Sequence, residues 1–246
     1  MGSSATKLKT FVPSLDTLTL VLCDLYQGVF YFVFDTIYVM SGPLSIFYFL
    51  VLIISIIVHE VAHGIAAERE GDPTARMLGR ITLNPLKHID WLGSVLLPLA
   101  LILSKAGFVV GWAKPVPYNP ENLKRGRKSV AIVSIAGIVV NLFIAVIFSL
   151  FIRGAALLGV TNAAFFDISS IIVLVNIVLA FFNAIPIAPL DGFRFLDAVL
   201  PLRFGTCMRS IEQYSLPILI LFLLFGWKFV APLAFKFFSF LSGIAL

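Results

Sequence analysis

Charged side chains are scarce in this sequence. Asp, Glu, Lys and Arg make up 13% of the 246 residues, whereas hydrophobic residues make up 60%. Soluble globular proteins carry about 25% charged residues, so this chain has too few polar side chains to cover a surface that faces water. The shortage excludes a large soluble domain and predicts an all-α polytopic membrane protein.

Cysteine is also rare. The two cysteines, Cys23 and Cys207, lie in or beside apolar stretches, and two such thiols do not form the disulfide framework of a small secreted protein. The net charge of +5 is modest for a chain of 246 residues. In a membrane protein this excess of Lys and Arg indicates basic cytoplasmic loops beside lipid, and we expect no nucleic-acid partner.

Long apolar stretches divide the chain into candidate membrane spans of about 20 residues each. The predicted spans are 17–41, 44–66, 129–153 and 168–190, followed by 213–246, which could hold two short spans or one span and an interfacial tail. Together they give about six transmembrane helices. An interfacial helix is the alternative for 17–41, because Asp24 and Asp35 would be costly inside lipid.

The motif His59-Glu60-Val61-Ala62-His63 lies within the span 44–66 and contains two of the three histidines of the chain. Residues four apart on an α-helix differ by about 40° of rotation, so His59 and His63 share one face, one turn apart. Two imidazoles on one face can hold a zinc ion. Glu60 lies about 100° around the helix, in a position to accept a proton from an attacking water.

A catalytic zinc site needs a third protein ligand. His88 is the remaining histidine, but it lies in a polar loop, where histidines are usually solvated. Asp191 is the stronger candidate, because carboxylates at membrane depth are rare and usually functional. It follows Pro186 and Pro189, which break the helix, and precedes Gly192, which allows close approach of the backbone. A helix cap is the structural alternative for Asp191.

These residues resemble the site-2 protease family of intramembrane zinc metalloproteases, in its compact branch without a PDZ domain. The resemblance extends from about Ser45 to Arg194. Its motifs are His59-Glu60-x-x-His63, Gly71-Asp72-Pro73-Thr74-Ala75, Leu83-Asn84-Pro85-Leu86-Lys87-His88-Ile89-Asp90, Gly111-Trp112-Ala113-Lys114-Pro115-Val116-Pro117, Ala136-Gly137-Ile138-Val139-Val140-Asn141 and Asn183-x-x-Pro186-x-x-Pro189-Leu190-Asp191-Gly192. One departure is Ile138, where the family usually has proline.

The resemblance implies a zinc metalloendopeptidase that cleaves a peptide bond within or near a transmembrane segment of a membrane-anchored protein. The expected Zn²⁺ ligands are His59, His63 and Asp191, and the expected catalytic residue is Glu60. Asn183 and Asn141 are amide groups at membrane depth, which we expect to bind the substrate backbone or the developing oxyanion. Hydrogen bonding between helices is the alternative for both amides.

The distribution of basic residues predicts the orientation in the membrane. Lys and Arg gather in the predicted loops 67–90, 111–128 and 193–212, whereas 154–167 contains none. Cytoplasmic loops are rich in Lys and Arg, so the first three loops are expected inside the cell and the fourth outside. The stretch 91–110 must then enter and leave the membrane on one side, as a re-entrant hairpin.

The metal site also requires a re-entrant hairpin at 91–110. If 91–110 crossed the membrane once, Asp191 would lie about 30 Å from His63, whereas zinc–ligand bonds measure about 2 Å. We therefore expect a protein of the cell membrane with its active site toward the cytoplasmic side. The predicted divisions of the chain are 1–43, a tail and first transmembrane helix; 44–192, the catalytic core; and 193–246, a cytoplasmic loop with C-terminal transmembrane segments.

A membrane protein that binds or transports metal ions without hydrolytic activity could use the same ligands. Transporters usually show internal repeats with broken helices in both halves. This sequence shows one broken helix, near Asp191, and no repeat. An inactive scaffold is a third alternative, and the intact Glu60 argues against it.

Overall fold

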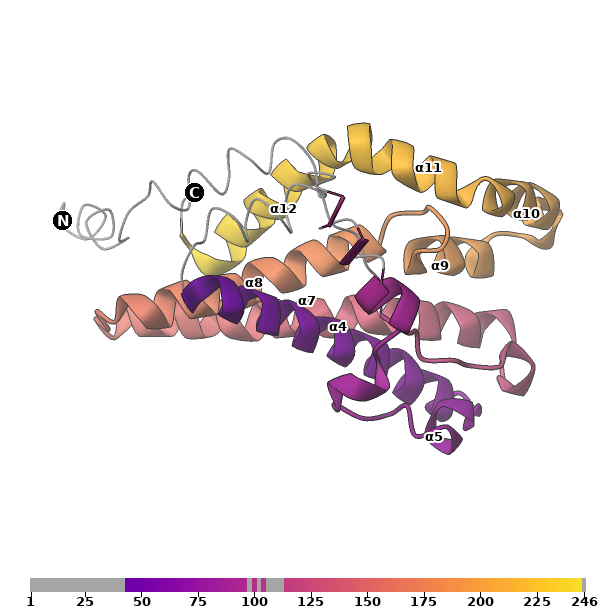
Figure 1. Cartoon of the computed structure of the whole chain (residues 1–246), viewed down its shortest axis with the longest axis horizontal. Coiled ribbons are helices and arrows are strands. Elements are labelled where there is room, and N and C mark those ends of the chain that lie inside the picture. Colours follow the sequence, from indigo (N-terminus) through magenta and orange to yellow (C-terminus); the bar gives the residue numbers. More distant parts are fainter. Residues whose placement is uncertain (1–42, 97–98, 101–102, 105–112, 245–246) are drawn as a thin grey trace.

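The computed structural model describes residues 43–96, 99–100, 103–104 and 113–244. All regular secondary structure in these ranges is helical, as the composition predicts (Figure 1). The helices are α4 (Pro43–Arg69), α5 (Thr74–Met77), α7 (Arg127–Leu157), α8 (Ala163–Asn183), α9 (Asp191–Val199), α10 (Gly205–Gln213), α11 (Ser215–Leu221) and α12 (Trp227–Ser242). Short helical turns lie at Pro85–Lys87, Trp91–Leu96, Pro120–Asn122, Leu202–Phe204 and Phe222–Gly226. The predicted span 17–41 lies outside the described residues.

Within the described ranges, three helices are long and apolar enough to cross a membrane. They cover Ile46–Arg69, Arg127–Leu157 and Ala163–Asn183, with 24, 31 and 21 residues. Each reaches the length of about 20 residues that spans a hydrocarbon core. These helices are α4, which carries the histidine motif, and the α7–α8 pair.

α8 begins earlier than the predicted span 168–190. Its first turn is capped by Asn162, whose side-chain oxygen accepts the backbone N–H of Phe165 at 3.1 Å. The cap supplies a partner for an N–H group that has none within the helix, so the helix can start here. The loop predicted at 154–167 is present but shorter, at 158–162, because α7 and α8 both extend into the predicted range.

α8 also ends early, at Asn183, and the chain turns before α9 begins at Asp191. Pro186 and Pro189 lie in this turn, and a proline ring cannot continue a helix. The residues between them are apolar, so hydropathy alone extended the predicted span too far. As a result, Asp191 starts a new helix instead of ending a membrane span.

α4, α7 and α8 pack together, and α7 runs antiparallel to the other two (Figure 1). A buried hydrogen bond joins α8 to α4, because Nδ2 of Asn176 donates to Oγ of Ser55 at 3.0 Å. Ser55 lies one turn before His59 on α4. Interhelical hydrogen bonds of this kind fix how two apolar helices are aligned, and this one fixes α8 beside the histidine motif.

The C-terminal part of the chain adds a further layer. The stretch 193–212, predicted as a loop, contains α9 and α10. These helices form because their apolar side chains bury one another: Phe193 and Leu196 of α9 pack with Met208 of α10. α12 packs on α7 and α8, and the side chains that it buries there include Ala231, Ala234 and Phe238.

The chain leaves the end of α4 and returns to the same end of the molecule at the start of α7. The backbone N–H of Lys124 donates to the carbonyl oxygen of Glu70 at 2.9 Å. Within the segment between α4 and α7, the N–H of Lys114 donates to the carbonyl oxygen of His88 at 2.8 Å. The two ends of 88–114 are thereby joined.

Candidate metal centre

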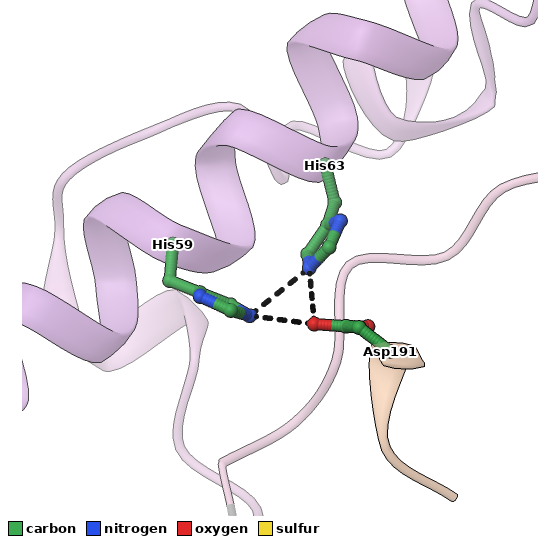
Figure 2. Close-up of side chains that lie close together, drawn as sticks. All are labelled: His59, His63 and Asp191. Atoms are coloured by element: carbon green, nitrogen blue, oxygen red, sulfur yellow. Dashed lines mark hydrogen bonds and ion pairs between the residues drawn. The ribbon is translucent and has the colours of Figure 1, made fainter. Parts of the chain in front are cut away.

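Two histidines and one carboxylate converge in the C-terminal half of α4 (Figure 2). His59 and His63 project from successive turns of α4, and Asp191 projects from the first turn of α9. Nε2 of His59 lies 3.0 Å from Oδ2 of Asp191, and Nε2 of His63 lies 3.1 Å from the same oxygen. The two Nε2 atoms are 3.0 Å apart. Side chains separated by 132 and 128 positions therefore meet at one point.

Two glycines let the three segments approach this closely. At Gly192, a Cβ atom would lie 2.3 Å from the carbonyl oxygen of Ala184, just after α8. At Gly137 in α7, a Cβ atom would lie 2.4 to 2.6 Å from the imidazole ring of His59. Both distances are far inside van der Waals contact, so any larger residue would displace Asp191 or His59.

The imidazole of His63 is oriented by a backbone carbonyl. Its Nδ1–H donates to the carbonyl oxygen of Val133 in α7 at 2.7 Å. Because the proton is on Nδ1, the lone pair of Nε2 points toward His59 and Asp191. Metal-binding histidines are generally fixed in this way by a partner on the second ring nitrogen.

The converging atoms fit a cation. Nε2 of neutral His63 and Oδ2 of ionised Asp191 are both acceptors, so at 3.1 Å they repel unless a positive charge lies between them. Tetrahedral zinc with bonds of about 2.0–2.1 Å separates its ligand atoms by about 3.3 Å. The observed separations of 3.0 to 3.1 Å are close to that value. Two imidazoles and one carboxylate also match the ligand types of catalytic zinc sites.

Beside the converging atoms lies a cavity of about 130 Å³. Glu60 forms part of its wall, and Oε2 of Glu60 accepts the backbone N–H of Val116 at 2.9 Å. The remaining wall residues come from the segment before α7, from α7 and from the α8–α9 turn and the start of α9: Pro115, Val116, Tyr118, Val133, Ser134, Asn183, Pro189, Leu190 and Arg194. A carboxylate able to accept a proton thus shares one cavity with three potential metal ligands.

The other predicted residues lie in different surroundings. Asn183 lines the cavity, with Nδ2 donating to the carbonyl oxygen of Leu179 in its own helix at 2.9 Å. Asn141 is fully buried in α7 and is not part of the cavity wall. His88 is buried away from the cluster, where its Nε2–H donates to the carbonyl oxygen of Thr82 at 2.9 Å. His88 is therefore not part of the converging cluster, and the substrate-binding roles of Asn183 and Asn141 stay predictions.

Among the wall residues that were not predicted as site residues from the sequence, Arg194 and Val116 offer polar groups to the cavity. Arg194 lies one helical turn after Asp191, a spacing that places both side chains on one face of α9 and that could have identified it. Val116 acts through its backbone N–H, and no side-chain pattern marks such a donor. The flanking prolines, Pro115 and Pro117, gave only the extended conformation of the segment.

Comparisons with known proteins give one family match and several relatives. Residues 47–167 and 155–226 match the model of peptidase family M50. The chain is 38% identical over 198 residues to YwhC of Bacillus subtilis, a match that covers 78% of this chain and 84% of that protein. It is 29% identical over 204 residues to Rip2 of Mycolicibacterium smegmatis, covering 78% and 73% of the two chains.

Rip2 of Mycobacterium tuberculosis is 29% identical over 188 residues, 72% of this chain and 68% of that one. These relatives are named as zinc metalloproteases. No solved structure matches the chain. The family match covers well over half of the sequence, including every residue of the converging cluster and the cavity wall. The chain therefore belongs to peptidase family M50, which confirms the predicted membership of the site-2 protease family.

Proposed function

We propose that this protein is an intramembrane zinc metalloprotease that hydrolyses a peptide bond within or near a transmembrane segment of a membrane-anchored protein. The observation that carries the proposal is that His59, His63 and Asp191 converge beside Glu60. The helix that carries the two histidines and Glu60 is long and apolar enough to span a membrane. Three ligands and an adjacent proton acceptor are the parts that zinc-dependent hydrolysis requires.

Each residue then has a defined role. His59, His63 and Asp191 would hold Zn²⁺, which when bound polarises a carbonyl and lowers the pKa of a water to about 7. Glu60 accepts the proton of the attacking water and delivers it to the leaving amine. The Val133 carbonyl keeps the His63 ring in the tautomer that can bind metal.

Substrate contacts are assigned by position in the cavity. Asn183 is the stronger candidate of the two predicted asparagines, because it lines the cavity whereas Asn141 lies outside its wall. Arg194 adds a cation to the same wall. Its guanidinium is suited to a substrate carbonyl or to the developing oxyanion. A membrane helix must unwind locally to present a peptide bond here, because its carbonyls are otherwise bonded within the helix.

We further propose that the chain lies in the cell membrane with about six spans, a re-entrant hairpin at 91–110 and the active site toward the cytoplasm. The hydrogen bond between Lys114 and His88 supports a segment that leaves and returns on one side. With Cys23 and Cys207 replaced by alanine, a cysteine at Glu121 should label from the cytoplasmic side only, and a cysteine at Leu158 from the outside only.

The alternative is a metal carrier without hydrolytic activity. Purified protein in liposomes separates the two functions when given a single-span substrate and, separately, external Zn²⁺. The protease cleaves the substrate, and Glu60→Gln abolishes cleavage while zinc stays bound. Zinc uptake into the liposomes by wild-type protein that cleaves no substrate would establish the carrier instead.

A further inference from the structure

The peptide bond between Pro115 and Val116 contacts Glu60 at one end and Arg80 at the other. The N–H of Val116 donates to Oε2 of Glu60 at 2.9 Å, and the carbonyl oxygen of Pro115 accepts a hydrogen bond from Nη2 of Arg80 at 3.1 Å. This N–H and this carbonyl belong to one planar group and point in opposite directions. Fixing the carbonyl therefore fixes the direction of the N–H.

Arg80 is held where its charge is costly. Its side chain is buried, with 8% of the residue exposed. The guanidinium donates to the carbonyl oxygens of Lys87, Lys114 and Pro115, and the bond to Lys114 measures 2.7 Å. Burying a cation costs free energy unless hydrogen bonds replace its hydration. All three acceptors are backbone carbonyl groups, so the Arg80 guanidinium holds the backbone of these two segments in place.

Prolines fix the register of this contact. Pro115 and Pro117 have no N–H, so Val116 carries the one backbone donor between Lys114 and Tyr118. A shift by one residue in either direction would place a proline nitrogen opposite Glu60 and leave the carboxylate without this donor.

The far end of the segment has a separate anchor. Oδ2 of Asp72 accepts the backbone N–H of Asn119 at 2.6 Å, and Oδ1 accepts from the side chain of Asn122 at 2.8 Å. Asp72 itself is fully buried. The cavity wall around Tyr118 is thus held independently of Arg80.

We infer that Arg80 is a positioning residue for the general base Glu60, an assignment that rests on the proposed protease function. The guanidinium holds the Pro115 carbonyl, the peptide plane transmits the restraint, and the Val116 N–H holds the Glu60 carboxylate at the cavity. A cation on the carbonyl also polarises the amide, which strengthens its N–H as a donor.

The test is cleavage kinetics of a single-span substrate by the full-length protein in liposomes. Arg80→Met should lower kcat about 10- to 100-fold, as expected when a catalytic group is misplaced by about 1 Å, with KM and zinc content unchanged. Arg80→Lys, which keeps the charge and a donor, should recover part of the loss. The matched control is Arg76→Met, because Arg76 lies four residues before Arg80, in α5, but pairs with Glu68 on the surface.

A coupling measurement distinguishes positioning from a general loss of structure. In a Glu60→Asp background the carboxylate is already displaced, so Arg80→Met should add less than about a threefold loss. Full additivity, or wild-type kcat in Arg80→Met, would overturn the assignment and leave the protease function standing. If Arg80→Met does not fold, Arg80→Lys replaces it in the test. Wild-type kcat in Arg80→Lys, with no coupling to Glu60, would then overturn the assignment. Absence of cleavage by wild-type protein contradicts the proposed function itself.

Discussion

A Cβ atom at Gly137 would lie 2.4 Å from Cε1 of His59 and 2.5 Å from its Nε2. The α7 backbone therefore forms the surface against which the first histidine of the motif packs. This contact gives a physical reason for glycine at this position in Ala136-Gly137-Ile138-Val139-Val140-Asn141, independent of any contact with substrate. It also makes the position of the His59 ring sensitive to a single methyl group.

Gly137→Ala should weaken zinc binding about 10- to 100-fold, the usual cost of disturbing a group that orients a metal ligand. Zinc titration of the purified protein against a chelator measures the change. Gly154→Ala is the matched control, since Gly154 lies in the same helix with nothing within 4 Å of its Cβ position. Equal affinity in the two variants would show that the His59 ring tolerates the added methyl group.

Removing a carboxylate should distinguish Asp191 from the remaining histidine as the third metal ligand. Asp191→Ala leaves two imidazoles for the metal, so bound zinc should fall from one equivalent to a small fraction. His88→Ala should leave zinc content unchanged, because His88 bonds to the Thr82 carbonyl and is not part of the cluster. Metal analysis of both variants decides the question, and loss of zinc from His88→Ala alone would reverse the assignment.

Two carboxylates beyond the end of α4 should make stability depend on pH. Hydrogen bonds from Arg125 and then Ser129 lower the pKa of Glu70. Burial raises the pKa of Asp72, but hydrogen bonds from Asn122, Thr74 and Asn119 together outweigh it and leave the pKa below its ordinary value. Lowered values mean that the ionised forms stabilise the fold.

This stabilisation is complete above the unfolded pKa of about 4 and is lost as pH falls through the lower folded pKa values. Asp72→Asn should therefore destabilise the protein by about 1–3 kcal/mol at neutral pH, with a difference from wild type that shrinks in acid. Thermal unfolding in detergent between pH 3 and 8 measures both curves. A difference independent of pH would contradict the role of the Asp72 charge.

The sequence predicted the residues whose chemistry is local. His59 and His63 share a face because of helical periodicity, and Asp191 is conspicuous because a carboxylate is rare in apolar surroundings. The helical class also follows from composition. Zinc–ligand bonds of about 2 Å cannot reach across a bilayer. This limit on distance predicted that Asp191 lies on the same side of the membrane as the two histidines.

Other features depend on tertiary contacts that no short pattern records. The bond from Val116 to Glu60 involves a backbone N–H, and the fit of Gly137 against His59 depends on how α7 packs on α4. The pairing of Asn176 with Ser55 requires the alignment of α8 with α4. The predicted end of α8 was wrong because the residues around Pro186 are apolar, and hydropathy does not distinguish a span from a buried turn.

Cleavage of a single-span substrate in water enriched in ¹⁸O tests the central claim most directly. Wild-type protein should yield a product whose new carboxyl terminus lies within or beside the membrane-spanning sequence and carries one ¹⁸O atom, as mass spectrometry of the product can show. Glu60→Gln should yield no product while retaining one equivalent of zinc. Undiminished cleavage by Glu60→Gln, or cuts confined to soluble regions of the substrate, would contradict intramembrane hydrolysis at this site.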